Sequence, residues 1–205
     1  MRRDKERASF LMKESSHINR GVLWILLCGV YLTSFSLLGF EIALTRLLSV
    51  MLSYHYVFAV VSLALLGLGV GGVFVHFFRP EIPRGHNRFG ALVLFAGLCS
   101  LAMALSTLLV VKIGHIESIR NNILFYCFVL STPFFFGGVF FAEVFRMYPA
   151  ISARLYGADL VGAAAGCIGV ILALNIIGGI STMFLFAVIT SMAALLFAFG
   201  AELMQ

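Results

Sequence analysis

Residues 21–49 read GVLWILLCGVYLTSFSLLGFEIALTRLLS, and the only charged side chains in this stretch are Glu41 and Arg46. A helix needs about 20 consecutive apolar residues to cross the hydrocarbon core of a bilayer, and a longer one crosses with tilt. The apolar character is continuous, whereas a transmembrane β-strand alternates apolar and polar positions. The stretch therefore predicts a membrane-spanning helix.

The rest of the chain has the same character. Of its 205 residues, 61% are hydrophobic and 11% are charged, and the mean hydropathy is +1.06. Soluble domains are roughly 45–50% apolar and about 25% charged. This composition excludes a soluble enzyme, a disordered chain, a collagen and a small disulfide-bonded protein. We expect an all-α, polytopic integral membrane protein.

Five further apolar runs follow the first. A basic N-terminal arm at 1–20 is expected to precede a transmembrane domain at 21–205. The expected spans are 21–49, 54–78, 89–111, 122–147, 155–177 and 182–201. Pro80 and Pro83 exclude helix from the loop at 79–88, and Pro133 predicts a kink inside the fourth span. Gly178 and Gly179 predict a tight turn before the last span.

The positive charges predict the orientation. Six basic residues precede the first span, namely Arg2, Arg3, Lys5, Arg7, Lys13 and Arg20. Since cytoplasmic segments carry an excess of Lys and Arg, the N-terminus is expected in the cytoplasm, and six spans return the C-terminus to the same side. The expected location is the inner or plasma membrane. No basic stripe interleaves with aromatic residues, so nucleic acid is not an expected partner.

Two sequence patterns recur in the two halves of the chain. Because each half has three spans, the halves would be inverted relative to each other, and ligand sites often lie between such repeats. The small residues also predict close helix packing. The matches pair Glu41-x4-Arg46 with Glu143-x2-Arg146, and Gly67-x3-Gly71 with Gly162-x3-Gly166. The chain is thus a candidate 3+3 inverted repeat, with offsets of 102 and 95 residues.

Charged side chains within the spans are the candidate site. Even the lowest estimates put their cost at about 2.5–3.5 kcal/mol each near the bilayer centre. One interpretation is a polar pocket that binds a small cation or relays protons; the other is a set of salt bridges and interfacial tyrosines that hold the bundle together. The candidate ligand-binding residues are Glu41, Arg46, Tyr56, Glu143, Tyr156 and Asp159. No catalytic residue, cofactor or metal site is expected, because no His, Cys and carboxylate cluster has ligand spacing.

Two segments carry a family resemblance. GFEIALTRLL at 39–48 and LYGADLVGAAAG at 155–166 resemble motifs of the membrane-bound spermidine synthase-like proteins. The resemblance implies a multi-helix membrane domain of the kind that precedes a cytoplasmic aminopropyltransferase domain. This sequence has no strand-and-glycine-loop segment, so aminopropyl transfer is expected only if a further domain or a cytoplasmic catalytic partner exists.

Three functions follow as hypotheses. The first is a membrane module that binds or passes a small cationic ligand, with Arg46 balancing the carboxylates and Tyr156 supplying a hydroxyl. The alternative is a structural or anchoring subunit that docks on other membrane-protein subunits or on a second copy of itself. The third is a membrane-tethered enzyme. The lipid bilayer is a partner in all three.

Overall fold

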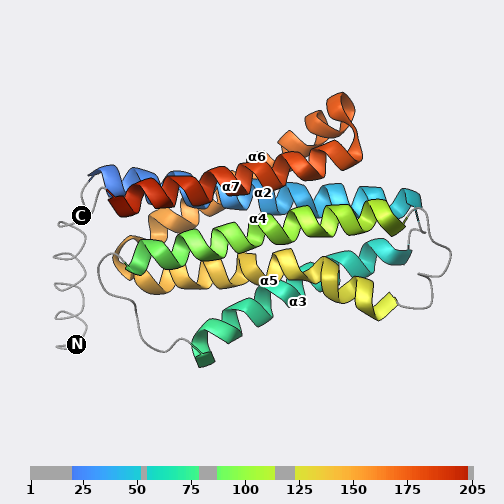
Figure 1. Cartoon of the computed structure of the whole chain (residues 1–205). Coiled ribbons are helices and arrows are strands. Elements are labelled where there is room, and N and C mark those ends of the chain that lie inside the picture. Colours follow the sequence, from blue (N-terminus) through green and yellow to red (C-terminus); the bar gives the residue numbers. More distant parts are fainter. Residues whose placement is uncertain (1–19, 52–54, 79–86, 114–122, 203–205) are drawn as a thin grey trace.

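The computed structural model describes residues 20–51, 55–78, 87–113 and 123–202 (Figure 1). These residues form six long helices and one short 3-10 turn, and no strand occurs among them. The elements are α2 (Arg20–Met51), α3 (His55–Phe78), α4 (Asn87–Ile113), α5 (Ile123–Met147), η2 (Pro149–Ile151), α6 (Ser152–Ile177) and α7 (Gly179–Glu202). All six long helices are apolar and long enough to cross a membrane, which confirms the predicted all-α, six-span class. The predicted arm lies outside the described residues, apart from Arg20.

The helix boundaries differ slightly from the predicted ones. α4 begins at Asn87, so the last two residues of the predicted 79–88 loop belong to the helix. Residues 79–86 lie outside the described part. α6 begins at Ser152, before the predicted start, because Pro149–Ile151 already forms a helical turn leading into it. Between α6 and α7, Gly178 has a φ of 81°, a left-handed conformation that favours glycine. Its carbonyl accepts a hydrogen bond from Thr182 Oγ1 at 2.7 Å, which holds the turn.

α5 continues through Pro133 (Figure 1). Proline has no N–H, so the carbonyl four residues earlier, that of Val129, loses its usual helical partner. Ser106 of α4 donates its hydroxyl to this Val129 carbonyl at 3.2 Å. A neighbouring helix thus satisfies a backbone group inside a lipid-spanning segment, where water is absent.

The order of helices in space differs from their order in the chain. α2 packs mainly on α6 and α7, α4 on α7 and α5, and α3 on α5. The contacts therefore run in the order α6, α2, α7, α4, α5 and α3. Figure 1 shows that α2 begins and α7 ends at one end of the bundle, here termed the N-terminal end. It also shows α3 and α6 leaning away from the other helices at opposite ends.

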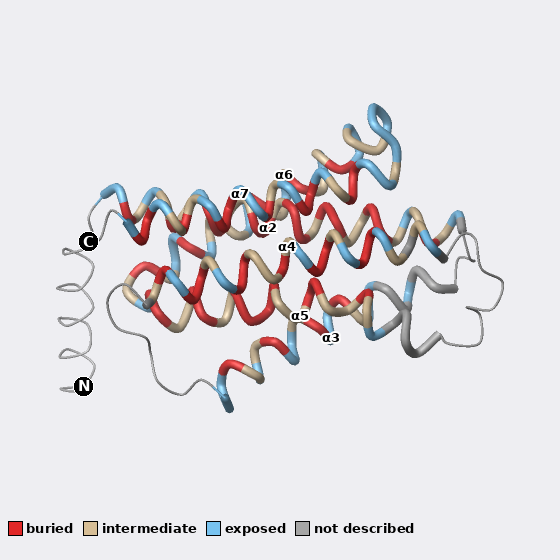
Figure 2. Tube along the Cα trace, in the orientation of Figure 1, coloured by how far each residue is buried: buried red, intermediate tan, exposed pale blue. Residues whose placement is uncertain are grey.

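Two groups of buried side chains form the core. The first cluster lies toward the N-terminal end and centres on Leu26, Phe89, Phe140 and Phe197. The second cluster lies further along α2 and centres on Phe40, Met103, Phe134 and Phe186. Aromatic rings dominate both: Phe140 and Phe197 have centroids 5.6 Å apart, and Phe40 and Phe134 lie 6.2 Å apart. Figure 2 shows this burial following the inward faces of the helices.

Glycines bring α6 into close contact with the backbone of α2. A Cβ built on Gly166 of α6 would lie 2.5 Å from the Phe35 carbonyl oxygen of α2, and one on Gly162 would meet the Tyr31 carbonyl oxygen. These distances are shorter than real Cβ contacts allow. Only a residue without a side chain lets α6 approach α2 this closely, which maximises van der Waals contact without a hydrophobic driving force from water.

Candidate functional site

The seam between α2 and α6 contains a polar pair. Asp159 lies on the α6 face that also carries Leu155 and Gly162, since residues three and four apart share one side of a helix. Across the seam, Ser34 is 3% exposed and donates its hydroxyl to Asp159 Oδ1. Asp159 is half-buried within a span that carries no other acidic residue. A carboxylate is therefore held, by a neutral donor, inside a lipid-spanning segment.

Glu41 lies on the same face of α2 as Ser34. The two residues are seven positions apart, or two helical turns, which is about 10 Å along the axis. Glu41 is half-buried and is flanked along α2 by the second-cluster residues Phe40 and Leu44. Within the described helices no hydrogen bond joins Glu41 to Asp159. The two carboxylates are thus separate groups along one face of α2.

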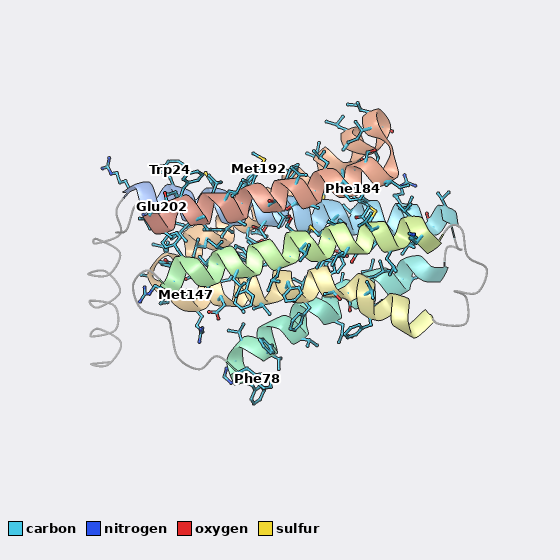
Figure 3. The ribbon with its side chains drawn as sticks, viewed as in Figure 1. Trp24, Phe78, Met147, Phe184, Met192 and Glu202 are labelled. Atoms are coloured by element: carbon cyan, nitrogen blue, oxygen red, sulfur yellow. The ribbon has the colours of Figure 1, made fainter. Side chains whose placement is uncertain are left out.

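The third predicted carboxylate belongs to a different region. Glu143 is completely buried on α5, between first-cluster residues Phe140 and Val144, and accepts a hydrogen bond from Arg146 Nη2 at 2.7 Å. Figure 3 shows Met147, one residue after Arg146, at the same end of the bundle as Trp24 and Glu202. Glu143 therefore lies at the N-terminal end, away from the level of Glu41.

Tyr148 follows Arg146 by two residues, and Arg88 of α4 lies over its ring. The guanidinium of Arg88 lies 5.9 Å from the centroid of the Tyr148 ring, a cation–π arrangement, and Phe89 meets the same ring edge-on at 6.5 Å. The Tyr148 hydroxyl is buried and has no hydrogen-bond partner among the described residues. Burial raises the pKa of Tyr148 to about 12, although the nearby Arg88 charge acts to lower it. The phenol therefore stays neutral at physiological pH.

The remaining predicted site residues point elsewhere or are not described. Arg46 is exposed and lies five residues after Glu41, on a different face of α2. Tyr156 is 55% exposed. Tyr56 belongs to α3, but its side chain lies outside the described residues. The structure thus brings Asp159 together with Ser34, aligns Glu41 with that pair, and pairs Glu143 with Arg146.

Ser34 is a site residue that the sequence pattern does not indicate. It lies in a run of hydroxyl residues in which Thr33 donates to the Gly29 carbonyl at 2.8 Å and Ser36 to the Leu32 carbonyl at 2.7 Å. Hydroxyls in apolar helices commonly bond back to their own helix in this way. Ser36 also bonds with Thr190 of α7 at 2.7 Å, so the packing of the neighbouring helices decides which partner each hydroxyl meets.

Metal binding has no support in the described helices. No three His, Cys, Asp or Glu side chains gather there closely enough to hold an ion.

Comparison with known proteins gives no relative. No family model matches the chain, and neither a curated protein nor a solved structure is detectably similar to it. What this six-helix membrane module does must therefore be argued from its own side chains.

Proposed function

We propose that this integral membrane module binds a small organic cation at the α2–α6 seam. Asp159 would supply the negative charge, Ser34 would orient that carboxylate, and Glu41 would supply a second charge further along α2. The observation that carries the proposal is the Asp159 carboxylate inside a spanning helix, whose one described hydrogen-bond partner is the uncharged Ser34 hydroxyl.

The physical reason is the cost of charge in lipid. An ionised carboxylate within a spanning segment needs a countercharge, a proton or water, and such groups commonly mark ligand and ion pathways. No Lys, Arg or His of the described helices forms an ion pair with Asp159, in contrast to Glu143, which has Arg146. A bound amine would give Asp159 the charge partner that the protein gives Glu143.

The spacing of the carboxylates suggests the ligand class. Two turns of helix, about 10 Å, separate Ser34, which holds Asp159, from Glu41. A flexible chain with amino groups at both ends can reach both acids, whereas a single metal ion cannot. The resemblance of residues 39–48 and 155–166 to spermidine synthase-like proteins supports the same class, since polyamines have this shape and charge.

Binding of spermidine to the purified protein in lipid nanodiscs tests the proposal. Wild-type protein should bind, and Asp159→Asn and Glu41→Gln should each weaken binding about tenfold, equivalent to about 1.4 kcal/mol. Glu202→Gln is the matched control, because this acid lies exposed at the end of α7 and should leave affinity unchanged. No binding by wild type, or equal binding by all four proteins, contradicts the proposal.

A structural or anchoring subunit is the second candidate. It is favoured by the outer face of α6, where large apolar side chains are exposed, among them Leu160, Ile168, Leu172 and Ile176. Both lipid tails and a partner helix can cover such a face. A partner that co-purifies in fixed stoichiometry, and is lost when Ile168 and Leu172 are changed to serine, would favour this function over amine binding.

A further inference from the structure

The contact of α6 with α2 recurs in the contact of α3 with α5. Gly162 and Gly166 of α6 lie against the carbonyls of Tyr31 and Phe35. In the other pair, a Cβ built on Gly67 of α3 would lie 2.9 Å from the Ser131 carbonyl oxygen, and one on Gly71 would meet the Phe135 carbonyl oxygen. Both pairs therefore place two glycines, four residues apart, on two carbonyls that are also four residues apart.

A third contact follows the same correspondence. Adding 95 to positions in α3 gives those in α6, and adding 100 to positions in α2 gives those in α5, so that 67 matches 162 and 31 matches 131. With these offsets Glu41 corresponds to Phe141, and not to Glu143 as the sequence pattern predicts. A Cβ on Gly169 of α6 would lie 2.8 Å from the Phe35 ring. The corresponding residues, Phe74 and Phe135, have ring centroids 5.6 Å apart. The same pair of offsets thus relates three contacts of one helix pair to three contacts of the other.

The order of helix contacts has the same symmetry. The order is α6, α2, α7, α4, α5 and α3. If each helix is replaced by its counterpart (α2 by α5, α3 by α6, α4 by α7, and the reverse), the same order is obtained when read from the other end. Figure 1 agrees, because α3 and α6 lean outward at opposite ends. The middle helix of each half therefore packs mainly on the first helix of the other half: α3 on α5, and α6 on α2.

The polar pair breaks this symmetry. By the same offsets, Ser34 corresponds to Phe134 and Asp159 corresponds to Ala64. Phe134 is 1% exposed and Ala64 is fully buried, and both belong to the second cluster. The second crossing closes with apolar side chains at the positions where the first has a hydroxyl and a carboxylate. Such a crossing does not need a polar pair to form.

We infer that the chain consists of two inverted halves that exchange their middle helices, and that Ser34 and Asp159 are a functional addition to one of two equivalent crossings. In this arrangement Asp159 is the ligand-binding group and Ser34 is its positioning residue. The assignment of a ligand rests on the proposed function. The inference that the helix packing does not need Ser34 and Asp159 is independent of it.

Thermal unfolding in one detergent tests the structural part. The double variant Ser34→Ala/Asp159→Ala should unfold at or above the wild-type temperature, because it removes a half-buried carboxylate with its buried hydroxyl partner and leaves the seam apolar like its counterpart. Gly166→Leu and Gly71→Leu should both lower the unfolding temperature by similar amounts, since each forces a side chain into backbone. Gly72→Leu is the control, because nothing lies within 4 Å of a Cβ at that position.

Two results overturn the inference. If the double variant unfolds as far below wild type as the two glycine variants, the polar pair is part of the scaffold. If only one of Gly71→Leu and Gly166→Leu has an effect, the two crossings are not equivalent.

Unfolding measured with and without spermidine distinguishes this inference from the proposed function. A ligand that binds only the folded state raises the unfolding temperature. Wild type and Ser34→Thr should show this rise, and Ser34→Ala should lose most of it, because threonine keeps the hydroxyl that holds Asp159. The absence of any rise in wild type contradicts the proposed function alone, and the unfolding comparison still decides whether the pair belongs to the scaffold. A full rise in Ser34→Ala contradicts the positioning role.

Discussion

Arg146 donates a hydrogen bond to Glu143 across 2.7 Å, and the carboxylate that receives it is completely buried while the guanidinium is 20% exposed. The two residues are three apart on α5, a spacing at which helical side chains meet. The arginine can thus extend toward the membrane surface and still neutralise an acid in the core.

Replacing this arginine should be costly. Arg146→Met removes a partner of a buried charge, which typically destabilises a protein by about 3 kcal/mol or more. Arg46→Met is the matched control, because Arg46 is exposed on α2, and its cost should be close to zero. Thermal unfolding in detergent measures both, and equal stability of the two variants would contradict the importance of the ion pair.

Removing the Tyr148 hydroxyl should stabilise the protein. Within the part of the chain that the structure describes, the buried hydroxyl has no hydrogen-bond partner, a situation that costs about 1–3 kcal/mol. Tyr148→Phe keeps the ring contacts with Arg88 and Phe89, so the unfolding temperature should rise. A fall on this substitution would show that the hydroxyl has a partner in the membrane-embedded protein.

The same residue makes stability depend on alkaline pH. Burial raises the pKa of Tyr148 from the usual 10.0 to about 12, so the neutral phenol is favoured in the folded state. Its contribution to stability is fully present below pH 10 and is lost as the pH rises toward 12. Unfolding measured between these values should show a steeper loss for wild type than for Tyr148→Phe. Parallel loss in both proteins would place the effect in another group.

Ser106, which donates a hydrogen bond to the carbonyl left without a helical partner by Pro133, offers a further test. Ser106→Ala leaves the Val129 carbonyl without the hydroxyl that replaces its helical partner, and should destabilise the protein by about 1 kcal/mol. Ser131→Ala is the control, because the half-buried Ser131 donates its hydroxyl to the Phe128 carbonyl of its own helix rather than to another helix. If both substitutions have the same effect on unfolding, the Ser106 hydrogen bond does not stabilise α5 at Pro133.

The class of the fold was predictable from residues 21–49 and their five counterparts, because lipid permits a continuous apolar run to form only a helix. The turn at Gly178 was also predictable, since its dihedral angle favours glycine. The ends of the helices were less predictable. η2 and the first turn of α6 begin before the apolar run, and the residues there have no hydrophobic periodicity that indicates a helix.

The candidate site was only partly predictable. Glu143 and Arg146 could be paired from their spacing alone, because both are on one helix. The partner of Asp159 could not, since Ser34 lies 125 residues away and its neighbours Thr33 and Ser36 have the same chemistry. Which hydroxyl meets the carboxylate depends on the rotation of α6 against α2, and that rotation is set by Gly162 and Gly166 together with the residues they contact.

The packing of α3 on α5 has a consequence for biosynthesis. The ribosome completes α3 at Phe78, but the helix that its glycine face contacts does not begin until Ile123. During that interval only lipid or a membrane chaperone can shield the face carrying Gly67 and Gly71. Packing of this face of α3 must therefore wait until α5 has been translated.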